Sequence, residues 1–217
     1  MAVVVMVLVP EPPARTPAPA AVHSGHSHLR QPMFLVVAAA GGLIQASHAV
    51  YYGFSTLDWG AKGFDGVAIG VLWALGVAAE IVLFAFAGRL PAVRPATLLV
   101  IGAAGGIIRW TVMVFDPPLA LLVPLQVLHA LSFGATHLGT MQYLSQSAPE
   151  GSRAAAQGDI ATANSVTMAA ASALAGVLYG ASGSLAYAAM AALAVAGGGF
   201  AVMAAHFMRV DASAPKS

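Results

Sequence analysis

Two strongly charged side chains lie inside long apolar stretches of the sequence. Glu80 and Arg109 stand on successive stretches, and His48, His129 and His137 stand on others. An ionisable group at membrane depth costs about 3 kcal/mol or more, so such groups typically mark proton relays, solute sites or ion pairs. We therefore expect a buried site that handles protons or binds an anion. A purely structural ion pair between Glu80 and Arg109 is the plainer alternative.

Uncharged polar residues recur at helical spacing on the same stretches. At 3.6 residues per turn, the polar residues between 126 and 140 fall within an arc of roughly 100°, and those between 45 and 55 fall within a similar arc. Such faces should turn toward a cavity or a neighbouring helix rather than toward lipid. The side chains that we expect to line a solute cavity are Gln45, His48, Tyr52, Trp73, Gln126, Thr136, His137 and Asn164.

Composition places these residues in a membrane. Only 8% of the 217 residues are charged and 59% are hydrophobic, with a mean hydropathy of +0.82. A soluble domain carries roughly a quarter charged residues, so the lipid bilayer is the expected surrounding. A net charge of +1 without a basic tract predicts no nucleic-acid partner. The absence of Cys excludes disulfides and zinc–thiolate sites.

Six apolar stretches are long enough to cross a hydrocarbon core of about 30 Å as helices. They are Met33–Phe54, Val67–Gly88, Ala96–Phe115, Leu119–Ser145, Ile160–Gly180 and Ser184–Phe207. Glycine- and proline-rich turn signals separate them. The sequence therefore predicts an all-α polytopic membrane protein with a six-helix bundle over residues 32–208. Trp59 and Trp110 lie near span ends, where tryptophan typically anchors a helix at the membrane interface.

The flanking segments are assigned by length and charge. Residues 1–9 are apolar but reach only about 14 Å as a helix, so they are interpreted as the remnant of a preceding transmembrane helix. Residues 10–31 are rich in Pro, Ala and His and are typical of a flexible linker, and residues 209–217 form a tail. Lys and Arg fall seven against one on the two sides of the predicted spans, which indicates that both termini are cytoplasmic.

Catalytic and metal-binding motifs are weak. His23, His26 and His28 can in principle bind Zn²⁺ or Cu²⁺, but no carboxylate lies beside them and a solvated linker is the favoured interpretation. The chain has no phosphate-binding loop of the G-x-x-x-x-G-K type. We expect no metal site, no cofactor and no enzymatic activity.

Four segments carry most of the polar residues described above. They are GLIQASHAVYYGFST at 42–56, VLWALGVAAE at 71–80, GIIRW at 106–110 and LHALSFGATHLG at 128–139. In order, they resemble the seventh to tenth helices of major facilitator superfamily transporters. The most similar branch is that of 3-phenylpropionate and oligosaccharide–proton symporters. The resemblance runs from about Leu29 to His206.

The resemblance implies the C-terminal six-helix half of a transporter that has two such halves around a midplane site. Residues 1–9 would then end the sixth helix, and 10–31 would be the central cytoplasmic linker. Lactose permease, a relative of this branch, uses a carboxylate on the eighth helix, an Arg on the ninth, and a His with a carboxylate on the tenth. By this resemblance Glu80, Arg109 and His129 are the proton-coupling residues. The tenth-helix carboxylate, expected near Ser132, is absent.

The expected function is proton-coupled secondary transport of a small organic solute across the bacterial cytoplasmic (inner) membrane. Its partners would be the solute, the proton, the lipid bilayer, and an N-terminal six-helix half or a second copy of the chain. One alternative is a non-transporting membrane subunit or a degenerate transporter fragment. Another is a membrane-embedded metal-handling protein that uses the linker histidines.

Overall fold

The computed structural model describes residues 31–88 and 93–213, without side-chain detail at 150 and 210–213. The predicted helix remnant at 1–9 and nearly all of the linker, including its three histidines, lie outside the described residues. The elements, in chain order, are α2 (Pro32–Ala46), α3 (Ala49–Ala61), α4 (Gly66–Ala87), α5 (Pro95–Met113), α6 (Leu119–Val127), η2 (Ala130–Ala135), α7 (Thr136–Ser147), η3 (Glu150–Ser152), α8 (Arg153–Ser182), η4 (Gly183–Ala186) and α9 (Tyr187–Ser213).

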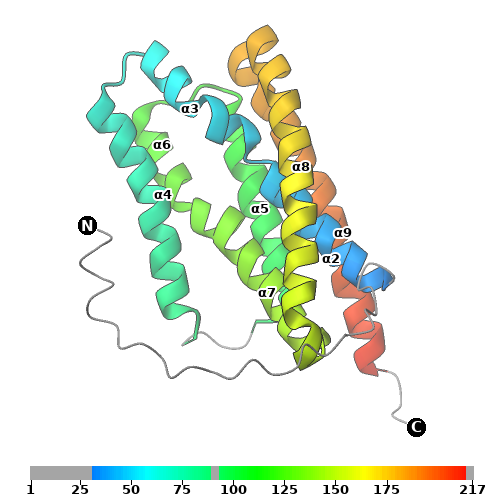
Figure 1. Cartoon of the computed structure of the whole chain (residues 1–217). Coiled ribbons are helices and arrows are strands. Elements are labelled where there is room, and N and C mark those ends of the chain that lie inside the picture. Colours follow the sequence, from blue (N-terminus) through cyan, green and yellow to red (C-terminus); the bar gives the residue numbers. More distant parts are fainter. Residues whose placement is uncertain (1–30, 89–92, 214–217) are drawn as a thin grey trace, which may run out of the picture.

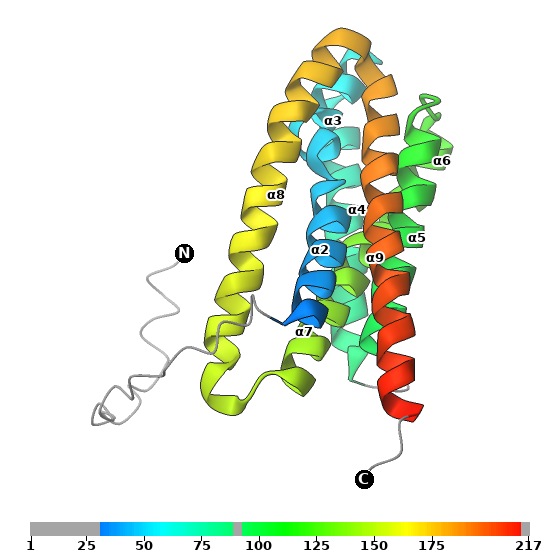
Figure 2. The ribbon, with the colours of Figure 1, turned by 90° about the vertical axis from the view of Figure 1, so that its right-hand side faces the viewer.

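The described chain is helical, as predicted, and it contains no strand in those two ranges. Five segments among the described residues are long and apolar enough to cross a membrane, and the last of them, Arg153–Arg209, contains α8 and most of α9. These two helices run side by side and are joined by the short η4 turn (Figure 2). The all-α polytopic class is confirmed, and the count of six spans stays a prediction.

The first predicted span has the wrong boundaries. It is broken between α2 and α3 and continues to Ala61, well past the expected end at Phe54. At the break, Ser47 Oγ donates to the Ile44 carbonyl at 2.6 Å. His48 Nδ1 lies 3.2 Å from the same carbonyl and 3.1 Å from that of Gln45. Side chains that bond to nearby carbonyls compete with the regular helical ladder, which accounts for the interruption.

Two later spans also differ from expectation. The span predicted as a continuous helix over Leu119–Ser145 consists of α6, one stretch of π-helix (η2) and α7. Pro124 lies inside α6, where its missing amide N–H removes one helical hydrogen bond. The span predicted over Ile160–Gly180 is longer, because α8 begins at Arg153 and ends at Ser182. Small residues before Ile160 extend the helix beyond its most apolar part.

α5 packs closely against α9, η2 and α7. A Cβ on Gly102 would collide with the Thr136 hydroxyl and would lie 3.2 Å from the Thr136 backbone nitrogen. Glycine is therefore required there to bring α5 and α7 together. Trp59 and Trp110 are both buried, at 0% and 1% exposure, so their predicted role as interfacial anchors is wrong.

α4 stands at one edge of the bundle, away from α8 and α9 (Figure 1). Only Leu72 and Gly76 of its 22 residues are buried. Much of the rest of its surface, including Val67 and Ile81, is exposed and apolar, whereas Trp73 and Glu80 are half-buried. A face of this kind needs lipid or a partner helix to cover it.

Candidate functional site

Arg109, near the end of α5, is the centre of a buried polar cluster and is only 1% exposed. Its Nη1 donates to Ser132 Oγ at 2.9 Å and to His129 Nδ1 at 3.2 Å, and its Nη2 donates to Gln126 Oε1 at 3.4 Å. All three partners are uncharged groups. In the described part of the chain, no carboxylate forms an ion pair with this guanidinium.

His129 lies between Arg109 and Glu80. Because a guanidinium only donates hydrogen bonds, His129 Nδ1 must accept, and the neutral ring then carries its hydrogen on Nε2. That nitrogen lies 3.5 Å from Glu80 Oε2. The structure thus shows an Arg109–His129–Glu80 chain in place of a direct ion pair between Glu80 and Arg109. The chain joins α5, the start of η2, and α4.

Ser132 and His48 extend the cluster toward the break after α2. His48 Nδ1 faces two carbonyls and therefore carries the hydrogen, so His48 Nε2 accepts from the Ser132 hydroxyl at 3.1 Å. The Ser132 oxygen in turn accepts from Arg109. Sequence reasoning missed this role of Ser132. The available signal was its position three residues after His129, which places both side chains on one face of a helix.

Aromatic rings border Arg109. Its Cζ lies 4.9 Å from the Tyr51 ring centroid and 4.5 Å from that of Trp110, within the range of cation–π attraction. The Tyr51 hydroxyl donates to Gln126 Oε1 at 2.9 Å, and its ring centroid lies 4.5 Å from that of Trp73. Tyr52 stacks on Trp73 at 6.1 Å and is 40% exposed, so it lies at the mouth of the cluster. Sequence analysis singled out Tyr52 and Trp73 but missed Tyr51.

A second group of predicted residues lines a separate groove of about 490 Å³ between α2, α7 and α8. Its lining is Gln45, Phe133, His137, Asn164, Ser165, Met168 and Ala169. The buried Oδ1 of Asn164 has no hydrogen-bond partner in the described part of the chain. Phe133 stacks on His129 at 5.2 Å and on His137 at 6.5 Å, so this ring separates the groove from the Arg109 cluster.

Thr136 differs from the other predicted lining residues. Its hydroxyl donates to the Ser132 carbonyl at 2.8 Å, and its side chain is fully buried against Gly102. The structure therefore places Thr136 in the contact between α5 and α7, away from the groove. The remaining predicted residues divide between the groove and the Arg109 cluster.

Comparison with known proteins identifies the family of the chain. The model of the MFS_1-like family matches residues 5–189. The chain belongs to this family. A region of 103 residues is 40% identical to the probable 3-phenylpropionic acid transporter of Escherichia coli (strain K12), covering 47% of this chain but only 27% of that protein. No solved structure matches the chain significantly.

These findings confirm the predicted resemblance to major facilitator transporters of the phenylpropionate branch. They support solute transport as the class of function and an integral membrane location, in agreement with the apolar helices. The matched relative extends well beyond the region that this chain covers.

Proposed function

We propose that the chain takes part in proton-coupled symport of a small aromatic carboxylate. The observation that carries this proposal is the buried Arg109–His129–Glu80 chain. It links a cation that has no carboxylate partner among the described residues to a carboxylate that can hold a proton. The name of the E. coli relative, which refers to an aromatic acid, agrees with this substrate class. We place the protein in the bacterial inner membrane with both termini cytoplasmic, as the distribution of Lys and Arg favours.

Arg109 is the proposed binding group for the substrate carboxylate. A buried cation without a countercharge is costly, and a bidentate carboxylate would supply both the charge and two hydrogen bonds. Tyr51 and Trp73, whose centroids are 4.5 Å apart, offer aromatic surface close by for the ring of the substrate. Since Arg109 is almost fully buried, substrate entry requires the aromatic side chains at the mouth to move, and Tyr52 is the most exposed of them.

Glu80 is the proposed proton carrier. When ionised, its carboxylate attracts the Nε2–H of His129 across 3.5 Å, which keeps His129 Nδ1 in place as an acceptor for Arg109. When Glu80 takes up a proton, that contact weakens and the His129 ring is freer to leave Arg109. The guanidinium then becomes available to the substrate carboxylate. Proton uptake and substrate binding thereby favour the same state, which is the condition for coupling.

We further propose that the bundle works beside a second six-helix unit, either an N-terminal half or another copy of the chain. The polar groove between α2, α7 and α8 and the partly exposed Glu80 carboxyl, 18% accessible, would be costly against lipid. A facing bundle would enclose them as a midplane cavity.

The test is substrate accumulation in proteoliposomes with Glu80→Gln, using 3-phenylpropionate as the probe and the partner half co-expressed where the chain alone is silent. We expect accumulation driven by a proton gradient to be lost while exchange of internal for external substrate persists. Asp159→Asn, which removes a carboxylate near the start of α8, serves as the matched control. Unchanged accumulation in Glu80→Gln would rule out Glu80 as the carrier, and silence of every form would favour a non-transporting subunit.

A further inference from the structure

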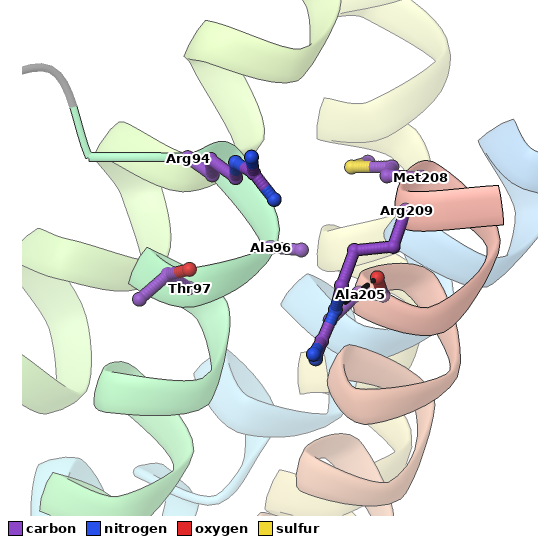
Figure 3. Close-up of a pocket in the computed structure, with 6 residues that line it drawn as sticks. All are labelled: Arg94, Ala96, Thr97, Ala205, Met208 and Arg209. Carbon is purple, nitrogen blue, oxygen red and sulfur yellow. Dashed lines mark hydrogen bonds between the residues drawn. The ribbon is translucent and has the colours of Figure 1, made fainter. Parts of the chain in front are cut away.

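Two arginines border a pocket of about 260 Å³ at the end of the bundle opposite Lys62. Arg94 immediately precedes α5, and Arg209 lies in the last turns of α9. Figure 3 shows Arg94 extending into the space between the two helices and Arg209 lying along α9. The other lining residues are Ala96, Thr97, Ala205 and Met208, so among the side chains that the structure describes none that lines the pocket is acidic.

The hydrogen-bond donors of this pocket are free to bind an anion. Arg209 Nε donates to the Ala205 carbonyl at 3.2 Å, and neither of its terminal nitrogens has a partner among the described residues. Within the described residues, neither the Arg94 guanidinium nor the exposed Thr97 hydroxyl has a hydrogen-bond partner. Two guanidinium groups that share a pocket repel each other unless an anion lies between them. Their planar donor geometry matches phosphate oxygens.

The pocket lies where two apolar segments end. The segment of α5 starts at Pro95, next to Arg94, and the segment of α9 ends at Arg209 itself. Exposed apolar side chains continue from the pocket at helical spacing along both helices. They are Ile101 and Ile108 on α5, and Val202 and Val195 on α9, with exposures of 36, 51, 57 and 55%. Because i, i+3 and i+4 positions share a face, these side chains lie below Thr97 and Arg209 on the same surface.

We propose that this pocket binds the phosphate group of an anionic phospholipid, with the acyl chains lying along the exposed apolar surface of α5 and α9. A basic pocket at the membrane boundary that continues into an exposed apolar surface fits a lipid, because the phosphate and the acyl chains would both be bound. A soluble anion would leave the apolar surface uncovered. The site is distinct from the proposed transport site, because Arg94 and Arg109 are about 22 Å apart along α5. The bound lipid would hold the start of α5 against α9.

The test is lipid retention by the full chain, purified in a zwitterionic detergent and examined by native mass spectrometry with phosphatidylglycerol or phosphatidylcholine added. We expect wild type to retain phosphatidylglycerol in preference to phosphatidylcholine. The double variant R94Q/R209Q should lose this preference about tenfold or more, because it loses the charge-assisted hydrogen bonds. Arg153→Gln is the matched control, since it removes one arginine from the same end of the bundle but lies outside the pocket.

A second variant tests whether lipid retention depends on the open space of the pocket, and not only on net charge or on correct folding. Thr97→Phe fills the pocket from an exposed position and keeps both arginines, and it should also reduce phosphatidylglycerol retention. Equal retention by wild type, R94Q/R209Q and Thr97→Phe would overturn the proposal. Displacement of phosphatidylglycerol by millimolar inorganic phosphate would also overturn it, because the site would then be one for a soluble anion.

Discussion

Arg109 donates a 2.9 Å hydrogen bond to the Ser132 hydroxyl, close to the position where the family resemblance predicted a carboxylate. A carboxylate there would neutralise the guanidinium within the protein. Ser132 instead satisfies one N–H and leaves the positive charge of Arg109 without a countercharge among the described residues. The substitution of a hydroxyl for a carboxylate thus favours an anionic solute at Arg109.

Restoring a carboxylate at this position should compete with the substrate. We expect Ser132→Asp to weaken binding of 3-phenylpropionate about tenfold or more, since an internal ion pair would occupy Arg109. Ser132→Ala adds no charge and is the matched control, for which we expect a smaller loss. Isothermal titration calorimetry on the purified protein measures both. Equal affinity of Ser132→Asp and wild type would show that Arg109 does not bind the substrate carboxylate.

Breaking the link between Arg109 and Glu80 should uncouple transport from the proton gradient. His129→Asn is too short to reach both partners, so we expect proton-driven accumulation to fall about tenfold or more while exchange continues. His137→Asn, in the separate groove, provides the comparison, and it should leave the dependence on the proton gradient intact. The measurement is uptake with and without an imposed pH gradient. Equal loss of uptake and exchange in His129→Asn would indicate a structural role only.

The fold class and the central charged residues were predictable because their physical signals are local. Long apolar stretches must be helices in a membrane, and the cost of burying Glu80 or Arg109 singles them out wherever the helices lie. The contacts of Tyr51 with Gln126 and Arg109 depend on lateral distances between helices, which the sequence does not contain.

The position of Thr136 has a more specific cause. The sequence analysis assumed an α-helical period throughout the fourth apolar stretch, which placed Gln126, His129, Thr136 and His137 on one face. The π-helical stretch Ala130–Ala135 inserts an extra residue into the turn and rotates everything after it by about 100°. Thr136 consequently faces Gly102 on α5, while His137 faces the groove.

The contact between α5 and α7 should not tolerate a side chain at Gly102. A methyl group there would overlap the Thr136 hydroxyl, so we expect Gly102→Ala to destabilise the protein by about 1–3 kcal/mol. Gly70→Ala is the control, since a Cβ at Gly70 has no neighbour within 4 Å and alanine favours a helix. Thermal unfolding in detergent measures both variants. Tolerance of Gly102→Ala would mean that the two helices lie farther apart than described.

The end of the bundle opposite the Arg94 and Arg209 pocket carries an ion-pair cluster with a defined pH dependence. Lys62 Nζ lies 2.6 Å from Asp58 Oδ2 and 2.5 Å from Asp116 Oδ1, so it joins the end of α3 to the turn after α5. Partial burial acts to lower the pKa of Lys62, but the hydrogen bonds to Asp116 and Asp58, together with their charges, raise it above its usual value. The folded state therefore holds this proton more tightly than the unfolded state.

A raised lysine pKa stabilises the folded state fully below the free-lysine value of about 10.4, and the effect is lost as pH rises through the higher folded value. Since the Lys62 side chain is 31% exposed, solvent screening keeps its contribution near 1 kcal/mol. We expect Lys62→Met to unfold about 2–4 °C below wild type at pH 8 and to match it at strongly alkaline pH. A deficit in Lys62→Met that persists at alkaline pH would assign the stabilisation to packing of the lysine stem, because only the ionic contribution disappears with the proton.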